Sequence, residues 1–283
     1  MSDVNTVSLT EDPDVIEGEP AALDVARLQQ TRTGSRIGAQ VHYFREIGST
    51  NSHARDLAEA GAAEGTVVIA ESQSQGRGRL GRRWESPAFS NLYLSILLRP
   101  KLAPAHAAQI TLMAAVALAD AVEAYIPGQV AIKWPNDILV GNKKLAGILT
   151  EASCDSECLR YVILGVGINV NYSRRAMPPE IRRRATSLLE VTGKAIDRET
   201  FLRRLLQGIE RCYGELENAG FAALAQRWQS YFAWRGRRVR VELLDQVTIG
   251  TAQGIDRDGA LLLLDDSGVE RRILAGDVIP LEN

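Results

Sequence analysis

The chain has 283 residues, of which 45% are hydrophobic and 24% charged, and its formal net charge is −2. These are the values of an ordinary globular protein, and they exclude a disordered or fibrous chain. The small net charge gives no overall electrostatic reason to bind nucleic acid or an anionic membrane, so any affinity for polyanions must be local. The length is sufficient for roughly two domains.

The N-terminal residues have a composition of their own. Residues 1–24 contain seven acidic side chains and no Lys or Arg, which is typical of a flexible tail. Residues 25–38 can form a short helix, but they are too few for a winged-helix DNA-binding domain. The start also lacks the basic region and apolar core of a signal peptide. We therefore treat residues 1–38 as an acidic, flexible segment.

Strands and helices are predicted in a mixed order over the next 200 or so residues. Runs of β-branched and aromatic residues predict strands at 41–47, 66–72, 91–98, 130–134, 137–140, 144–152 and 159–170. Helices are expected from a cap at Ser49, Thr50 or Asn51 to about residue 60, over about residues 105–125, and twice after the basic connection 173–184. We assign residues 39–234 to one domain.

The predicted helix at 105–125 is the most apolar part of the chain. It contains Asp120 and Glu123, which favours a helix buried in a soluble protein over a membrane span. The chain has three cysteines: Cys154, Cys158 and Cys212. They lack the spacing of a zinc site, and reduced thiols of a cytoplasmic protein are the simpler interpretation. We expect a cytoplasmic protein.

The sequence changes character near residue 235. Val239, Val241 and Leu243 alternate with polar residues, and Gly259 and Gly268 mark turns between short apolar runs. Several short strands at this spacing predict a small β-barrel. We assign residues 235–283 to it.

Residues 76–84, GRGRLGRRW, are here called the arginine loop. The pattern G-x-G-x-x-G is present, but a dinucleotide-binding turn needs a helix at the third glycine and an acid about 20 residues later, and neither follows. A nucleic-acid-binding segment stays an alternative, since Arg/Gly segments with an aromatic bind single strands. Glycines allow a loop to open and close, and arginine suits contacts with carboxylate and phosphate. We favour a mobile cover over an anionic small molecule.

Three further stretches carry polar groups at the ends of predicted elements. They are GSTN at 48–51, KWPND at 133–137 and KKLAGIL at 143–149. Each alone is explained as a helix cap or a surface turn. Lys144 begins a largely apolar strand, where an amine is poorly accommodated unless it meets an anion.

Taken in order, STN, the arginine loop, KWPND, KLAGIL, GVGIN at 165–169 and a C-terminal barrel resemble the biotin protein ligase family over about residues 41–283. The chain differs from repressor-type members because no N-terminal DNA-binding domain is recognised. The resemblance implies an α+β fold similar to class II aminoacyl-tRNA synthetases, with a mixed sheet, helices on one side and an SH3-like barrel.

The resemblance also implies a two-step reaction and the residues that perform it. Biotin and MgATP would form biotinyl-5′-AMP, and the biotinyl group would pass to a lysine of a biotin carboxyl carrier domain. The implied catalytic residues are Lys144, Arg79 and Asp137, with Asp137 the candidate Mg²⁺ ligand or general base. The implied biotin contacts are Ser49, Thr50, Asn51, Gln73, Arg77, Gly78, Arg79, Trp84 and Lys144. The implied nucleotide contacts are Arg77, Arg79, Lys133, Trp134, Asn136 and Asn169.

Two alternatives stay open at this stage. A lipoate-type ligase shares the fold and the adenylation chemistry, although the arginine loop favours biotin. A nucleic-acid-binding module would use the arginine loop alone, and we expect no specific DNA binding. The resemblance also makes a homodimer through the edge of the sheet plausible.

Overall fold

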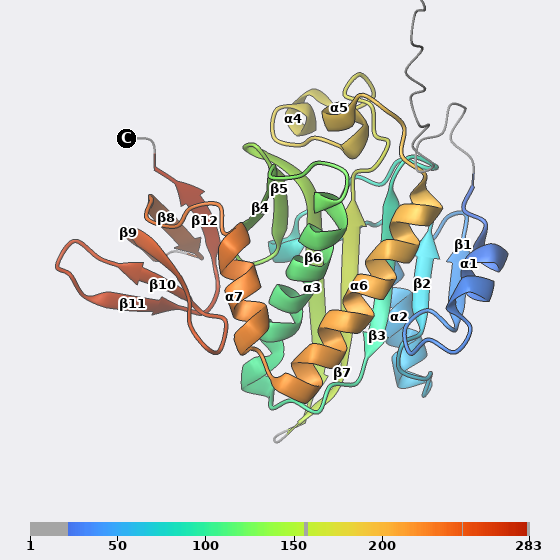
Figure 1. Ribbon diagram of the computed structural model, residues 1–283, viewed down its shortest axis with the longest axis horizontal. Coiled ribbons are helices and arrows are strands. Elements are labelled where there is room, and N and C mark those ends of the chain that lie inside the picture. Colours follow the sequence, from blue (N-terminus) through green and yellow to red (C-terminus); the bar gives the residue numbers. More distant parts are fainter. Residues whose placement is uncertain (1–21, 156–157, 245, 282–283) are drawn as a thin grey trace, which may run out of the picture.

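The computed structural model describes residues 22–155, 158–244 and 246–281, so most of the predicted acidic segment lies outside the described residues. The main domain contains a seven-stranded sheet in the order β1-β2-β3-β7-β6-β5-β4 (Figure 1). The strands are β1 Val41–Phe44, β2 Val67–Ala70, β3 Leu92–Leu98, β4 Val130–Lys133, β5 Asp137–Val140, β6 Lys143–Cys154 and β7 Leu159–Ile168. Only the β1–β2 pairing in this sheet is parallel. The predicted mixed sheet and all seven of its strands are therefore confirmed.

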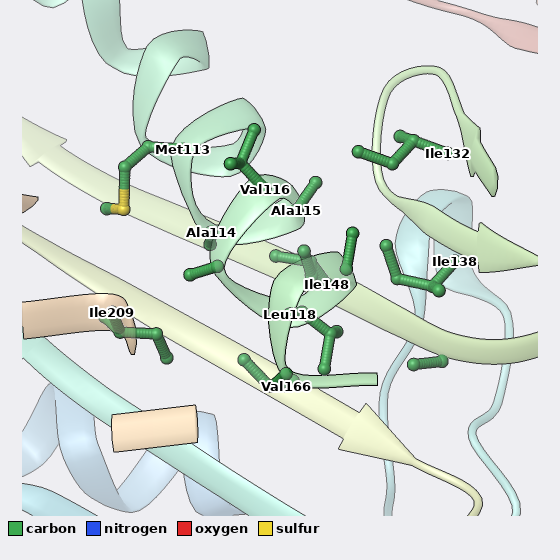
Figure 2. Packing of buried hydrophobic residues seen from close by; sticks show 14 of the residues in the cluster. Met113, Ala114, Ala115, Val116, Leu118, Ile132, Ile138, Ile148, Val166 and Ile209 are labelled. Carbon is green, nitrogen blue, oxygen red and sulfur yellow. The ribbon is translucent and has the colours of Figure 1, made fainter. Parts of the chain in front are cut away.

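Three helices cover one face of this sheet: α3 Ala107–Glu123, α6 Arg198–Ala219 and α7 Ala222–Tyr231 (Figure 1). Figure 2 shows α3 side chains such as Leu118 close to Ile148 of β6, Val166 of β7 and Ile209 of α6. The stretch Pro104–Glu123 is long and apolar enough to cross a membrane, but 67% of its apolar window is buried inside the protein. The prediction of a buried core helix is confirmed.

The opposite face is covered by α2 Thr50–Glu59. Ala54 and Ala58 of this helix pack on Val68, Leu97 and Ile163 of the sheet. The expectation that helices lie on one side is therefore wrong for α2. The reason is that β2 and β3 are buried along their whole length and are apolar apart from Ser95, so both faces of the sheet must be covered.

The remaining helices are short: α1 Val25–Arg32, α4 Pro179–Arg182 and α5 Leu188–Thr192. The structure confirms the short helix predicted within residues 25–38. It is attached to the main domain, because Leu28 and Arg32 are buried and the Arg32 guanidinium binds the carbonyl of Ile37 at 2.7 Å and the carboxylate of Glu210. Helix α4 lies within the basic connection 173–184.

The C-terminal unit is a five-stranded antiparallel sheet in the order β11-β10-β9-β8-β12. Its strands are β8 Arg238–Leu243, β9 Gln246–Ile255, β10 Leu261–Leu264, β11 Glu270–Ile273 and β12 Asp277–Pro280. Its apolar side joins the main core near α7 (Figure 1). Two hydrogen bonds add to this contact: the Trp134 indole donates to the carbonyl of Gly259 at 3.1 Å, and Gln109 donates to that of Arg257 at 3.2 Å. The predicted all-β unit is confirmed.

Candidate active site

Two adjoining cavities lie beneath the arginine loop. The inner cavity has a volume of about 50 Å³ and reaches the N-terminus of α2, and the outer cavity has a volume of about 280 Å³ and reaches the segment that contains α4. Five residues line both cavities: Gly78, Arg79, Trp84, Asn136 and Lys144. The two cavities are therefore parts of one site, and these five residues lie between them.

Glycines on β6 and β7 make room for the inner cavity. Gly147 and Gly167 are partners across the two strands. A Cβ atom on Gly167 would come within 2.6 Å of the Trp84 indole, and one on Gly165 within 2.0 Å of Oδ1 of Asn51. The glycines of KLAGIL and GVGIN thus allow two side chains to lie directly on the strand backbone.

The polar groups at the inner end are uncharged and bind one another. The backbone nitrogen and hydroxyl of Thr50 donate to Oε1 of Gln73 at 2.9 and 3.1 Å. The buried hydroxyl of Ser95 lies 2.6 Å from Oδ1 of Asn51 and 2.9 Å from the Thr50 hydroxyl. Ser49 holds the N-cap position of α2, its side chain makes no capping hydrogen bond, and the residue lines the inner cavity. This end of the site is a preorganised set of neutral donors and acceptors.

The arginine loop folds back on itself as a narrow hairpin. The nitrogen of Trp84 donates to the carbonyl of Gly76 at 2.9 Å, and that of Gly78 to the carbonyl of Arg82 at 2.7 Å. At the tip, Leu80 has a φ of +55° and is 58% exposed. A left-handed conformation at a non-glycine residue is uncommon. The hairpin brings Trp84 down into the cavity while its tip remains in solvent.

Each inward arginine of the loop meets a different part of the chain. Arg77 binds Glu151 of β6 at 2.7 Å. Arg79 donates to Oδ1 of Asn136 at 2.9 Å and to the carbonyl of Gly276, in the C-terminal unit, at 3.3 Å. Burial lowers the pKa of Arg79 against the opposing attraction of nearby carboxylates, yet a guanidinium stays charged in proteins. The loop thus carries a desolvated positive charge over the cavity.

Lysine–carboxylate pairs line the outer part of the site. Nζ of Lys144 lies 2.7 Å from Oδ1 of Asp137 and 5.2 Å from the centre of the Trp84 ring. Lys133 lies 2.9 Å from Asp277 of β12, and Arg82 lies 2.7 Å from the same carboxylate. Burial would raise the pKa of Asp277, but hydrogen bonds and attraction from these two cations outweigh it and hold the pKa below its ordinary value.

Comparison with known proteins agrees with this geometry. Residues 43–169 match the Biotin/lipoate A/B protein ligase family, and residues 236–279 match the Biotin protein ligase C terminal domain. The chain is 37% identical over 266 residues to the biotin–[acetyl-CoA-carboxylase] ligase of Mycobacterium tuberculosis, covering 92% of this chain and 96% of that protein. The chain belongs to the biotin protein ligase family.

Two further relatives place the chain among known ligases. The bifunctional ligase/repressor BirA of Bacillus subtilis is 38% identical over 242 residues, which cover 86% of this chain and 74% of that protein. The biotin protein ligase from Aquifex aeolicus in complex with biotin and ATP is 32% identical, with a TM-score of 0.74 over 86% of this chain and 99% of that chain. The α+β biotin ligase fold with its C-terminal β unit, expected from the motifs, is confirmed.

The structure brings most of the residues predicted for a biotin protein ligase into one site. The inner cavity is lined by Ser49, Thr50, Asn51, Gln73, Arg77, Gly78, Arg79, Trp84, Asn136 and Lys144. Asp137 and Asn169 line the outer cavity. Lys133 lies in the groove that continues from it toward the C-terminal unit. Their roles in binding and catalysis stay predictions.

Trp134 is the exception. It lines neither of these two cavities, its side chain is 2% exposed, and its indole donates to Gly259 of the C-terminal unit. Trp134 instead lines a neighbouring cavity of about 170 Å³ that also includes Arg79 and Asn136, and its predicted nucleotide contact stays a prediction. The geometry also makes Trp134 part of the contact between the main domain and the C-terminal unit.

Sequence reasoning missed several residues of the site. Tyr172, Arg184 and Asp277 line the outer cavity, and Ser95 supports the inner one. The signals were weak: Ser95 is a lone hydroxyl in an otherwise apolar strand, and Arg184 belongs to a run of arginines that resembles a solvated connection. Asp277 offered no signal, because it is one acid among many in the C-terminal unit.

Proposed function

We infer that this protein is an ATP-dependent biotin–protein ligase that makes biotinyl-5′-AMP and transfers the biotinyl group to a lysine of a biotin carboxyl carrier domain. One observation carries the assignment of the site: Lys144 lies between the uncharged polar groups at the inner end of the inner cavity and the charged outer cavity. A substrate with an uncharged ring and a carboxylate, joined to a nucleotide, fits this division. The family membership supports the same reaction.

We assign the ring of biotin to the inner cavity. A buried ureido group needs paired donors and acceptors, and the hydroxyl and amide groups of Ser49, Thr50, Asn51 and Gln73 supply both. The inner volume of about 50 Å³ is far below the roughly 300 Å³ at which ligand pockets begin. The Trp84 side chain and its loop must therefore shift when biotin enters, after which the indole can pack against the acyl tail.

In the first step, a biotin carboxylate oxygen attacks the α-phosphorus of ATP while the bond to the pyrophosphate oxygen breaks. Both reactants are anions, so fixed positive charge at the point of attack lowers the barrier. Lys144 of β6 and Arg79 of the arginine loop, which line both cavities, supply it. We propose that Lys144 exchanges Asp137 for the carboxylate and α-phosphate of the reactants.

In the second step, the neutral ε-amine of the carrier lysine attacks the acyl carbon, and AMP leaves with the electrons of the anhydride bond. The amine must lose a proton during this attack. Asp137 is our candidate base, because its carboxylate lines the outer cavity and is only 14% exposed. Asn169 and Asn136 would then hold the nucleotide part.

We expect Mg²⁺ to enter as part of its complex with ATP. The described residues contain no group of three or more His, Cys, Asp or Glu side chains that could hold a metal. Asp137 alone fits a cation that keeps most of its ligands from phosphate and water, and it is paired with Lys144. Glu85, Glu180 and Asp277 also line the outer cavity, but Asp277 is already paired with Lys133 and Arg82, so Asp137 remains our candidate ligand.

The alternatives are weaker on this geometry. A nucleic-acid-binding role for the arginine loop is disfavoured, because Arg77 and Arg82 are engaged by Glu151 and Asp277 of the same chain. A lipoate-type ligase falls within the same matched family, but the polar inner end is costly to bury against an apolar ring. We further propose a cytoplasmic enzyme that associates as a homodimer through a sheet edge and does not bind DNA specifically.

The test is isotope exchange between ATP and pyrophosphate. We expect exchange that depends on biotin and is not supported by lipoate, followed by label transfer from biotin to a carrier domain. Exchange with lipoate but not with biotin would assign the lipoate reaction, and no exchange with either would contradict adenylation.

A further inference from the structure

Glu151 on β6 lies just outside the reacting centre and contacts two parts of the site at once. Its Oε2 accepts a hydrogen bond from the Asn51 amide at 2.7 Å, and its Oε1 accepts one from the Arg77 guanidinium at 2.7 Å. The side chain is 25% exposed, and both of its partners, Asn51 and Arg77, line the inner cavity. One carboxylate thus joins the N-terminus of α2 to the arginine loop.

The contact with Asn51 determines which way the amide points. Its nitrogen donates to Glu151 and to the carbonyl of Leu149 at 3.2 Å, which uses both of its protons. Its oxygen accepts from Ser95 at 2.6 Å. Turning the amide around would place oxygen against the carboxylate and the carbonyl, and two acceptors repel. Glu151 therefore keeps the Asn51 oxygen directed toward the Ser95 hydroxyl and the backbone of Gly165, beside the inner cavity.

The contact with Arg77 holds the first arginine of the loop. Arg77 is 42% exposed, and its guanidinium also contacts the hydroxyl of Ser52 at the long distance of 3.5 Å. Arg55 lies 4.0 Å from the same carboxylate and adds positive charge around it. A hydrogen bond between two charged groups is shorter and stronger than a neutral one. Glu151 is thus the main attachment of this side of the loop to the sheet.

We propose that Glu151 is a positioning residue that couples the orientation of Asn51 at the ring end of the inner cavity to the placement of the arginine loop over it. This rests on the function proposed above. Glu151 touches no reacting atom. It acts through Asn51 and Arg77, so its loss weakens biotin binding and frees the loop without slowing the chemical step.

The substitution Glu151→Gln tests the charge and the acceptor geometry at nearly constant volume. The Gln side chain has one acceptor oxygen and one donor nitrogen. In the unsubstituted protein, Asn51 and Arg77 each donate to one oxygen of Glu151. The variant can therefore keep the hydrogen bond with Asn51 or the one with Arg77, but not both. Glu151→Asp keeps the charge and both acceptors, and should recover much of the function.

The measurement is ATP–pyrophosphate exchange as a function of biotin concentration. For Glu151→Gln we expect the KM for biotin to rise by about tenfold to a hundredfold, the range of one or two charged hydrogen bonds. The KM for ATP and kcat at saturating biotin should stay within about twofold of the unsubstituted protein, a margin worth well under 1 kcal/mol. Trypsin should cut the arginine loop faster in the variant without ligand.

Glu59→Gln is the matched control, since Glu59 ends α2, pairs with Arg160 at 3.9 Å and lines neither cavity. It should leave the KM for biotin and the loop cleavage unchanged. An unchanged KM for biotin in Glu151→Gln would overturn the proposal, as would a fall in kcat with unchanged KM. If the unsubstituted protein shows no biotin-dependent exchange, the proposed function fails, which is a separate result.

Discussion

The inner and outer cavities of the site differ in the kind of polar group that lines them. At the inner end, hydroxyl and amide groups of Thr50, Gln73 and Ser95 bind one another and carry no charge. At the outer end, Lys144 and Lys133 are paired with carboxylates that come from β5 and β12. A neutral network can be complete before a ligand arrives, whereas paired charges must exchange partners when a phosphate enters. The inner end is therefore expected to select the ligand, and the outer end to respond to it.

A buried network of charged and amide groups links segments that carry residues of the two cavities. Glu71, two residues before Gln73, is fully buried and pairs with Arg198 at 2.7 Å. Arg198 also donates to the carbonyl of Asn91 at 2.9 Å, and the Asn91 amide lies 3.4 Å from that of Asn169. This buried network connects the strand end that carries Gln73 to the motif that carries Asn169.

The largest effect that we expect is the loss of folding stability when the pair of Glu71 and Arg198 is broken. Arg198→Ala leaves the buried Glu71 carboxylate without its cation, and losing one partner of a buried pair costs about 3–5 kcal/mol. The free energy of unfolding in urea should fall by that amount. The double variant Glu71→Gln/Arg198→Met should recover part of it, because no charge is then left buried. Wild-type stability of Arg198→Ala would show that the inner cavity does not depend on this pair.

The next effect tests the outer end. Lys144→Ala removes a positive charge that we place at the point of attack, and the loss of such a donor costs about 2.7–4 kcal/mol of transition-state stabilisation. Single-turnover formation of biotinyl-AMP should slow accordingly, with an unchanged circular dichroism spectrum. Lys143→Ala is the control, because Lys143 is adjacent on β6 but lines neither cavity. A rate close to that of the unsubstituted protein would remove Lys144 from the mechanism.

The third prediction concerns the loop that separates the cavities. Arg79→Gly removes charged contacts worth about 1.5–3 kcal/mol, so the variant should still form biotinyl-AMP but release it faster. The measurement is the dissociation of labelled adenylate in the absence of carrier. Leu80→Gly adds the same backbone freedom at the exposed tip without removing charge, and should retain the adenylate. Similar release from both variants would attribute the effect to flexibility alone.

The smallest expected effect is at the junction with the C-terminal unit. Asp277→Asn removes the partner of Lys133 and Arg82, and because Arg82 is 64% exposed we expect a loss of only about 0.2–1 kcal/mol of stability at neutral pH. The folded pKa of Asp277 lies below its ordinary value of 3.8. Its contribution is therefore complete above the unfolded pKa and is lost as pH falls through the folded one.

The difference in thermal stability between Asp277→Asn and the unsubstituted protein should accordingly disappear as the pH is lowered below about 4, the unfolded value. Asp266→Asn, at an exposed pair in the same unit with 70% exposure of the carboxylate, provides a comparison that does not reach the site. A difference that persists at low pH would mean that Asp277 acts by packing rather than by charge.

The sequence by itself determined the elements and the motifs. Strand and helix patterns are local, since they depend on the alternation of apolar side chains over a few residues, and so the seven strands and the core helix were predicted within a few residues at their ends. The motifs were recognisable for the same reason, because each is a short contiguous stretch. The second covered face was missed, since a run of apolar residues does not say which element will pack on it.

Only the tertiary structure decided how these stretches meet. Arg79 and Gly276 are 197 positions apart, and Asn51 and Glu151 are 100 apart, yet both pairs are in hydrogen-bonding distance. The Trp134 indole donates to Gly259 and lines neither the inner nor the outer cavity, although KWPND places it next to two residues of the site. Side-chain partners depend on how distant segments pack, and neighbours along a strand point to opposite faces. The position of a residue in a motif therefore predicted which part of the protein it lies near. Which group its side chain contacts was decided by the packing of distant segments.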